Sequence, residues 1–398
     1  MRKMTENNFE LKHDDFEEDR YSRLRLIPWW EQERLTNATI MVVGAGAIGN
    51  ELIKNLTLLG IGRILIFDMD SIESTNLTRS VLFRAKDVGR YKAEVAAERV
   101  KEMNPDVKTK AFVNNIIDDV GLGVFRRMDV VLGGLDNREA RLAINQSCYH
   151  VNVPWIDGAI EALNGFARVF IPGQGACYEC TMTETDWMLI NKRKSCALLT
   201  HSQMAEGKIP TTPTSSSVIA GIQVQEMLKL LHSDRGLPTL AGKGYVFNGL
   251  THDSYVVEYQ RKEDCMSHDT YEKIIEKPWS VKTMTLKELL SNIKAELGEN
   301  AVVDFDRDIA TKAHCTCGHK MDLFTPVHKL KGESLVCPDC GATMQFDTFH
   351  VLRGDEDFLD KTLYEVGIPL LHIICGRVGV DTTYFEFSAD ETEVFNNI

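Results

Sequence analysis

The sequence lacks the features that would place it in a membrane or on nucleic acid. No apolar run approaches the roughly 18 residues that a membrane-spanning helix needs. The opening segment, 1–19, is polar and acidic without the apolar core of a signal peptide, and we expect it to be flexible. Acidic residues outnumber basic ones by 58 to 45, which argues against general binding to nucleic acid or anionic lipid. We therefore expect a cytoplasmic protein with no nucleic-acid or membrane partner.

Internal repeats and low-complexity tracts are also absent, and 398 residues are enough for two or three domains. The ten cysteines do not indicate disulfides, because most of them lie in close pairs typical of zinc sites in a reducing compartment. The composition changes after about residue 275. We expect one large domain over 20–275 and a smaller α+β domain over 276–398.

Alternating strand and helix patterns mark the large domain. Residues 39–70, "TIMVVGAGAIGNELIKNLTLLGIGRILIFDMD", predict a strand, a tight turn, a helix and a second strand. Continuous apolar runs such as "TIMVV" are typical of parallel strands covered on both faces. A further helix, stopped by Pro105, precedes "DVVLGGLDN", which we take as a third strand. This order predicts a doubly wound, Rossmann-like α/β sheet.

The turn "GAGAIG" places Gly44, Gly46 and Gly49 between a strand and a helix. Glycines there let phosphate approach the backbone N–H groups of the helix N-terminus. Asp68 ends the next strand, where an acid accepts hydrogen bonds from ribose hydroxyls. The motif alone fits NAD, FAD or ATP, and some such turns only pack a helix on a strand.

Polar residues that follow the strands favour a triphosphate. They are Asp70, Asn76, Arg79, Lys92, Asp136 and Asn137. The carboxyl ends of parallel strands meet at one crevice, where cations would neutralise phosphates and a carboxylate would hold Mg²⁺. An enzyme that transfers hydride does not need all of these residues at one site. The alternative for each residue taken by itself is a solvated side chain on the surface.

Several motifs taken together resemble one known family. "RYSR", "VVGAGAIGNE", "DMDSIESTNLTRS", "VGRYKAE", "LDNREAR", "CYEC" and "KEDCMSH" follow the order seen in ThiF/MoeB adenylyltransferases and ubiquitin-activating enzymes. The likeness is greatest to the catalytic subunit of the neddylation activating enzyme, and it covers roughly Arg20 to His268. It implies that 20–275 is an adenylation domain that uses ATP and Mg²⁺.

The resemblance also implies individual roles. Asp68 would bind the ribose, while Asn76, Arg79 and Lys92 would contact the triphosphate. Asp136 would hold Mg²⁺, with Asn137 lining the same pocket. Arg23 is similar to the family's arginine finger, which reaches the phosphates of a partner protomer and so implies a homodimer. Ala47 departs from the glycine that is frequent in bacterial relatives.

Two groups of residues have the spacing of metal ligands. Cys177 and Cys180 form CxxC, and Cys265 with His268 forms CxxH, which together supply the four ligands of a structural zinc. Relatives commonly have a fourth cysteine in place of His268. A lost site with leftover thiols is the alternative.

The second group is Cys315, Cys317, Cys337 and Cys340, in CxC and CxxC pairs within a zinc-ribbon pattern over about 312–345. His314 and His319 are further potential ligands. A structural or protein-docking role fits this ribbon better than nucleic-acid binding, since it interrupts a small domain of an acidic protein. The surrounding domain resembles the β-grasp-like ubiquitin-fold domain that recruits conjugating enzymes, and "ETEVFNNI" lacks the Gly-Gly tail of a modifier.

Three cysteines remain. Cys148 and Cys375 lie in apolar segments and are most simply core residues. Cys196 lies in the polar crossover 184–213, two residues after the cationic run Lys192, Arg193 and Lys194, and nearby cations lower the pKa of a thiol. The resemblance places the family's nucleophilic cysteine in this stretch. An incidental exposed thiol is the alternative, and His201 is a candidate helper base.

The motifs and the resemblance together predict ATP-dependent activation of a ubiquitin-like protein that ends in glycine. The steps would be adenylation of its C-terminus, thioester formation on Cys196 and transfer to a conjugating-enzyme cysteine. One alternative is a MoeB/ThiF-type sulfur-carrier adenylyltransferase without such transfer. Others are a non-catalytic zinc-bearing scaffold and, more remotely, a dehydrogenase.

Overall fold

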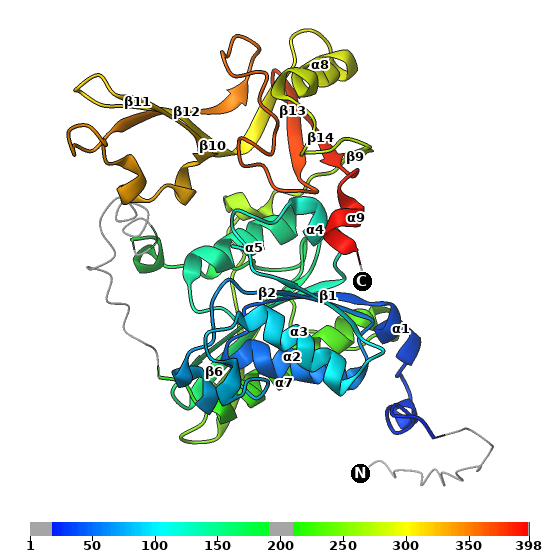
Figure 1. Cartoon of the computed structure of the whole chain (residues 1–398). Coiled ribbons are helices and arrows are strands. Elements are labelled where there is room, and N and C mark those ends of the chain that lie inside the picture. Colours follow the sequence, from blue (N-terminus) through cyan, green and yellow to red (C-terminus); the bar gives the residue numbers. More distant parts are fainter. Residues whose placement is uncertain (1–17, 189, 191–209, 397) are drawn as a thin grey trace, which may run out of the picture.

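The computed structural model describes residues 18–188, 190, 210–396 and 398. Two sheets organise this part of the chain, an eight-stranded one below and a six-stranded one above it in Figure 1. No helix among the described residues has the length and apolar character needed to cross a bilayer.

The first five strands of the large sheet are parallel, in the order β3-β2-β1-β4-β5. They are β1 (Thr39–Val43), β2 (Arg63–Phe67), β3 (Lys108–Phe112), β4 (Val130–Gly133) and β5 (Trp155–Glu161). Every residue of β1 and β4 is buried, as their apolar runs predict. The sheet then continues antiparallel through β6 (Asn164–Phe170), β7 (Lys243–Asn248) and β8 (Asp253–Glu258).

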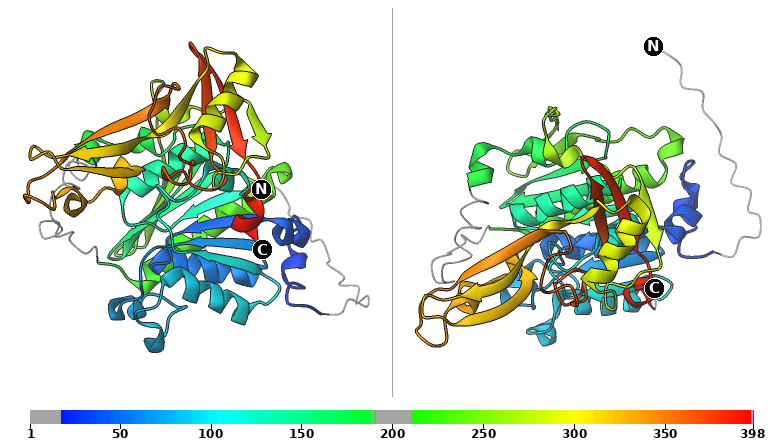
Figure 2. Two further views of the ribbon diagram at one scale, coloured as in Figure 1. Left: turned by 45° about the horizontal axis from the view of Figure 1, so that its top comes forward. Right: turned by 90° about the horizontal axis from the view of Figure 1, so that it is seen from above.

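Helices cover both faces of this sheet (Figures 1 and 2). One face packs on α2 (Ala47–Leu59), α3 (Lys92–Met103) and α7 (Pro213–Leu231). The other face packs on α4 (Leu122–Arg126) and α5 (Arg138–His150). Sequence-based expectations for α2 and α3 are confirmed. The cap of α7 is Thr212, whose hydroxyl accepts the Ser215 N–H.

The edge strand β3 of the large sheet was not predicted. The expected third strand is the fourth along the chain, because β3, "KTKAF", forms the parallel edge beside β2. Its alternating lysines hide it from a search for apolar runs, although an edge strand tolerates polar side chains. Shorter helical elements are α1 (Gln32–Asn37), η1 (Leu24–Leu26), η2 (Ser74–Thr78), η3 (Ala85–Asp87), η4 (Glu179–Thr181), η6 (Ser233–Arg235) and η7 (Met266–His268).

The second sheet has the order β11-β10-β13-β14-β9, with β12 paired to β10. Its strands are β9 (Ile274–Lys277), β10 (Val302–His314), β11 (Lys320–Pro326), β12 (Gln345–Leu352), β13 (Ile373–Val378) and β14 (Asp381–Phe387). The helical elements here are α8 (Leu286–Leu297), η8 (Val327–Lys329), η9 (Gly332–Leu335) and α9 (Glu391–Phe395). The strand β9 runs parallel to β14, and the apolar face of α8 packs in this sheet's core.

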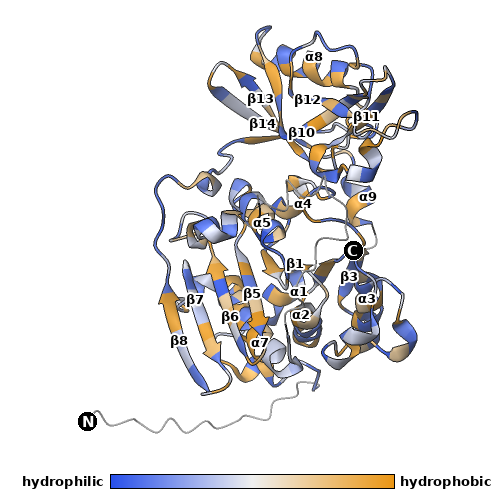
Figure 3. Cartoon of the chain, turned by 90° about the vertical axis from the view of Figure 1, so that its left-hand side faces the viewer, coloured by the Kyte–Doolittle hydropathy of each residue, from blue (hydrophilic) through white to orange (hydrophobic). Residues whose placement is uncertain are grey.

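A single hydrophobic core joins the two sheets. Leu371, Ile373 and Val394 of the C-terminal part pack in the same cluster as Leu65 and Phe67 of β2. In Figure 1 the red helix α9 descends beside the large sheet, and in Figure 3 apolar residues line the strands of that sheet. The C-terminal part therefore covers a stretch of the large sheet that α4 and α5 leave open.

Candidate functional site

The glycine turn leaves the N-terminus of α2 open. Gly44 has φ +91°, a left-handed conformation that favours glycine. A Cβ on Gly49 would lie 1.8 Å from the carbonyl oxygen of Gly44, so strand and helix can meet this closely only without a side chain there. Gly46 caps α2 without a side-chain hydrogen bond, and a Cβ there would meet nothing within 4 Å. Space therefore remains beside Gly46 for an anion to approach the N-terminus of α2.

Asp68 is fixed beside this turn. Its carboxylate accepts the Ala45 N–H at 2.7 Å and the Asp70 N–H at 2.9 Å. Burial raises the pKa of Asp68, an effect that the nearby Lys92 ammonium and the two N–H donors oppose. The side chain is therefore held rigidly between the glycine turn and the segment after β2.

Lys92 and Asp70 pair with each other close to Asp68. The Lys92 ammonium donates to the Asp70 carboxylate at 2.7 Å, and the Lys92 backbone N–H donates to the Asp70 carbonyl. Lys92 is the first residue of α3, whereas Asp70 follows β2. The structure thus brings together three residues that the sequence proposed separately: Asp68, Asp70 and Lys92.

Asn76 and Arg79 lie in and directly after η2. The Asn76 side chain accepts the Glu73 N–H at 2.8 Å and so closes a capping box. The Arg79 guanidinium donates to the Thr75 carbonyl at 2.7 Å. Both side chains are half-buried and have further donors to offer a ligand.

Asp136 and Asn137 follow β4 at the same edge of the sheet. A Cβ on Gly134 would lie 3.0 Å from the Gly49 nitrogen, so the turn that carries Asp136 borders the glycine turn. Asn137 caps α5 by accepting the Ala140 N–H at 2.7 Å, and Asp136 is exposed. Arg138 donates to Asp186, which begins the crossover, at 2.5 Å.

Arg23 lies at the other end of the domain. Tyr21, two residues earlier, packs on Gly60 at the C-terminal end of α2 and accepts a hydrogen bond from Asn104. The 13 residues of α2, about 20 Å in length, separate this end from the glycine turn. The exposed Arg23 is therefore not brought to the glycine turn of its own chain.

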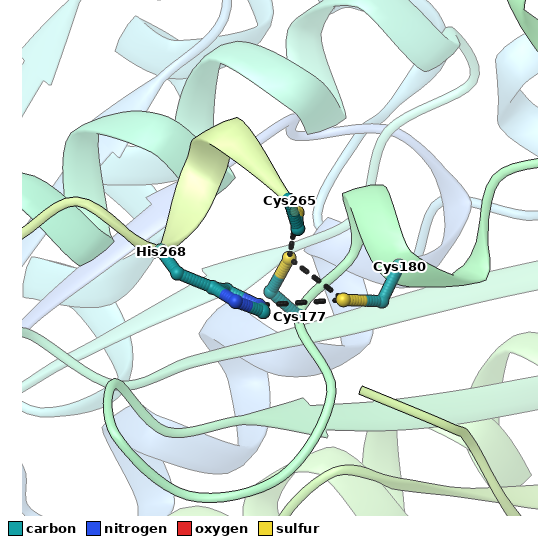
Figure 4. A group of neighbouring side chains, drawn as sticks. All are labelled: Cys177, Cys180, Cys265 and His268. Atoms are coloured by element: carbon teal, nitrogen blue, oxygen red, sulfur yellow. Dashed lines mark hydrogen bonds between the residues drawn. The ribbon is translucent and has the colours of Figure 1, made fainter. Parts of the chain in front are cut away.

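The first metal-ligand group converges as its spacing predicted (Figure 4). The Cys177 sulfur lies 3.7 Å from the Cys180 sulfur and 3.5 Å from the Cys265 sulfur. The His268 Nε2 atom lies 3.3 Å from the Cys180 sulfur. A tetrahedral zinc with Zn–S bonds of about 2.3 Å separates its sulfur ligands by about 3.7 Å. The donor set therefore fits Zn²⁺.

Two buried polar groups beside this group strengthen the fit. Asn145 Nδ2 and the Tyr149 hydroxyl have no hydrogen-bond partner among the described residues. Both lie beside the sulfurs: the Asn145 oxygen accepts the Tyr178 N–H, and the Tyr149 ring stacks on His268 at 5.6 Å. Metal-bound thiolates accept hydrogen bonds, so they would satisfy donors that neutral thiols leave without partners.

The second group also converges. The Cys315 and Cys340 sulfurs are 3.4 Å apart, and those of Cys317 and Cys337 are 3.6 Å apart. All four ligand atoms lie within 4.8 Å of one another, again as zinc requires. His319 is not part of the group, because its Nδ1 atom lies 2.8 Å from Asp339. His314 also stands outside it and faces Asp347.

The three other cysteines differ in what the structure describes. Cys148 is fully buried, as expected of a core residue, and Cys375 is half-buried on β13. Burial raises the pKa of both thiols, that of Cys375 to about 11, so neither is an activated nucleophile. Cys196 and His201 lie outside the described residues.

A buried ionic group that no sequence motif indicated lies between the turn that carries Asp136 and the first metal-ligand group. Asp157 on β5 is fully buried and binds Arg141 of α5 and Arg168 of β6. The signal was present, because acidic and basic residues inside the apolar strands "WIDGAIE" and "FARVF" are costly unless they pair.

Relatives of known name share this part of the chain. Ubiquitin-like modifier-activating enzyme 5 of Arabidopsis thaliana is 30% identical over 249 residues, which are 56% of this chain and 55% of that protein. The NEDD8-activating enzyme E1 catalytic subunit of Caenorhabditis elegans is 38% identical over 174 residues, 39% of this chain and 40% of that protein. The chain spans about half the length of the curated relatives it matches.

Solved structures also resemble this chain over most of the large domain. The crystal structure of E. coli MccB with ATP superposes with a TM-score of 0.53 at 25% identity, covering 64% of this chain and 75% of MccB. A structure of the same protein with AMPCPP and MccA gives a TM-score of 0.52 at 25% identity, covering 63% and 74%. The sequence profile of the ThiF family matches residues 18–267. Since this match covers more than half of the chain, the protein belongs to the ThiF family.

Proposed function

We propose that the chain activates a ubiquitin-like protein by adenylating its C-terminal glycine. The observation that carries the proposal is the group of residues gathered at the carboxyl ends of β1, β2 and β4. There the open N-terminus of α2, the fixed carboxylate of Asp68 and the Lys92–Asp70 pair lie beside the turn that carries Asp136. Relatives named as modifier-activating enzymes, and a solved relative with ATP, support the same chemistry.

The first step would join the modifier to AMP. The modifier's terminal carboxylate attacks the α-phosphorus of ATP, the bond to the β-phosphate breaks, and pyrophosphate leaves. Asp68 would bind the ribose, while Asn76, Arg79 and Lys92 would contact the phosphates. Asp136 would hold Mg²⁺, which neutralises phosphate charge when bound, and Asn137 would line the same pocket.

Lys92 is poised to change partners in this step. In the structure its ammonium pairs with Asp70, whose side chain is exposed. A triphosphate carries far more negative charge than one solvated carboxylate, so it would draw the ammonium away. Asp70 would then hold Lys92 in place until the nucleotide arrives.

The second step would move the modifier onto Cys196. The thiolate attacks the acyl carbon of the adenylate, a thioester forms and AMP leaves. Lys192, Arg193 and Lys194 precede this cysteine in the sequence and favour its thiolate form. The modifier would finally pass by thioester exchange to a cysteine of a conjugating enzyme.

The position of Arg23 supports a homodimer. Because α2 separates this residue from the glycine turn of its own chain, it can act as an arginine finger only on a second copy. We propose that two protomers exchange these arginines across their interface.

The C-terminal part would dock the conjugating enzyme, and zinc would hold both cysteine groups. Support for a ubiquitin-fold-like domain comes from the mixed sheet, in which β9 pairs parallel with β14 and α8, the helix after β9 in the chain, packs in the sheet's core. A β-grasp unit has a hairpin before its helix, whereas only β9 precedes α8 here. The long strand β10 continues into the proposed ribbon and ends just before Cys315.

The test combines pyrophosphate exchange with detection of a thioester. We expect Cys196→Ala to retain modifier-dependent ATP–pyrophosphate exchange within about twofold and to form no reducible modifier adduct. Cys375→Ala is the matched control, because it removes a half-buried thiol and should leave both activities intact.

The outcomes separate the alternatives. An undiminished thioester in Cys196→Ala would contradict the assignment of the nucleophile. Exchange without any adduct in the unmodified protein, with thiocarboxylate as product, would identify a sulfur-carrier adenylyltransferase. Absence of modifier-dependent exchange would favour a non-catalytic scaffold.

A further inference from the structure

A fully buried carboxylate connects the nucleotide crevice to the first metal-ligand group. Asp157 Oδ1 accepts a hydrogen bond from Arg141 Nε at 2.8 Å, and Asp157 Oδ2 accepts one from Arg168 Nη2 at 2.5 Å. Asp157 lies opposite Gly133 on β4 and opposite Arg168 on β6, so the three neighbouring strands meet at this carboxylate. We call Asp157, Arg141 and Arg168 the Asp157 network.

The Arg141 arm reaches the turn that carries Asp136. Arg141 Nη2 donates to the Leu135 carbonyl at 2.5 Å and to the Gly158 carbonyl at 3.3 Å. Leu135 immediately precedes Asp136, which has no side-chain hydrogen bond of its own among the described residues. The position of the Asp136 backbone therefore depends on the guanidinium of Arg141.

The Arg168 arm reaches the CxxC turn. Arg168 Nη1 donates to the Thr181 hydroxyl at 3.1 Å, and that hydroxyl donates to the Tyr178 carbonyl at 2.7 Å. The guanidinium also lies over the Tyr178 ring at 4.9 Å. Tyr178 lies between the ligands Cys177 and Cys180, and Thr181 follows them, so this arm holds the backbone of the turn.

Stability alone does not account for such a group. Replacing a buried ion pair or triad with apolar residues of similar volume is often neutral or stabilising. The network buries two positive charges against one negative charge. Apart from the bond of Arg141 to the Gly158 carbonyl of β5, its remaining donors go to the two functional turns. The geometry of the network is suited to holding the backbone of these two turns in position.

We propose that the Asp157 network is a positioning device with two separable arms, one for the Mg²⁺-binding turn and one for the zinc-binding turn. The first arm rests on the proposed adenylation of the modifier, and the second arm rests on the proposed zinc. Its residues touch neither ATP nor zinc; they act through the backbone of Leu135 and through Thr181 and Tyr178.

The test removes one arm at a time. In Arg141→Met and Arg168→Met the carboxylate of Asp157 keeps one arginine, so no charge is left without a counter-charge and folding should survive. Arg307→Met is the matched control. Arg307 is also buried, pairs with Asp306 and donates to the Asp118 carbonyl, but it contacts neither functional turn.

Each arm has its own readout. Arg141→Met should raise the Mg²⁺ concentration that half-saturates pyrophosphate exchange by roughly 10- to 100-fold, with the release of zinc to a chelator unchanged. Arg168→Met should accelerate zinc release at least tenfold, with the Mg²⁺ requirement unchanged. Asp157→Asn should change both. Arg307→Met should lower the melting temperature without changing either.

The results can overturn the proposal directly. Arginine variants that behave like Arg307→Met would show a purely structural role, and a change of both readouts in each single variant would refute separable arms. Failure of the proposed function is a different result, since the unmodified protein would then show no exchange. Calorimetric titration of the same variants with Mg·ATP, together with zinc release, would still test the network in that case.

Discussion

Asp157 shows how a single residue connects burial, charge and pH. It is fully buried, and burial alone would raise the pKa of its carboxyl group, but Arg141 and Arg168 outweigh that cost and lower the pKa. A carboxylate with a lowered pKa stabilises the fold at every pH above its unfolded-state pKa of about 3.9. The stabilisation is lost as the pH falls through the lower, folded-state value.

The lowered pKa of Asp157 predicts how the stability of Asp157→Asn depends on pH. At pH 7 the variant should lose about 3–5 kcal/mol of unfolding free energy, because two buried guanidinium groups lose their only shared counter-charge. The difference from the unmodified protein should stay constant down to about pH 4 and then shrink as the pH falls further. Urea unfolding across that pH range measures it. A difference that grows in acid would contradict the assignment of a charged Asp157.

At the scale of elements, the sequence predicted those features that depend on short stretches of the chain. The apolar runs of β1 and β4 predicted buried parallel strands. The cysteine spacing predicted both metal-ligand groups, because ligands close in sequence are also close in space. The edge strand β3 escaped because its lysines break the pattern. The motif around Arg23 suggested the role of this residue but not its position. Its distance from the glycine turn depends on where α2 runs in the folded domain.

Two glycines of one turn should respond differently to alanine. Gly49→Ala places a Cβ 1.8 Å from the Gly44 carbonyl oxygen, so β1 and α2 must separate, at a cost of about 1–3 kcal/mol or more. Gly46→Ala meets nothing within 4 Å, should leave stability unchanged and should occupy the open space before α2.

Chemical denaturation and nucleotide titration distinguish these two effects. For Gly46→Ala we expect the KM for ATP in pyrophosphate exchange to rise roughly tenfold, which corresponds to about 1.4 kcal/mol. An unaltered KM in a stable Gly46→Ala protein would mean that the phosphates do not approach the N-terminus of α2.

For the whole molecule, the contacts that hold the C-terminal part against the large sheet join segments far apart in the chain. Glu386 of β14 is fully buried between Arg126 and Arg127, which end and follow α4. Leu371 and Val394 complete the core over β2. No local pattern reveals such pairings, so the sequence predicted two domains but not that they share a core. This shared core makes the C-terminal part a structural cover of the large sheet.

The shared core predicts that both sheets unfold together and that one methyl group at their junction weakens both. Gly123 of α4 donates its N–H to the Leu371 carbonyl at 2.8 Å, and a Cβ on Gly123 would lie 2.5 Å from that oxygen and 2.8 Å from Glu386 Oε1. Gly123→Ala should therefore cost about 1–3 kcal/mol of unfolding free energy and split one calorimetric transition into two.

Gly221→Ala is the matched control. Gly221 lies inside α7, where a Cβ would meet nothing within 4 Å, so the substitution should stabilise the protein by about 0.5–1 kcal/mol. A Gly123→Ala protein that melts in a single transition at the original temperature would show that the junction yields freely, and the C-terminal part would then be free to move relative to the large sheet.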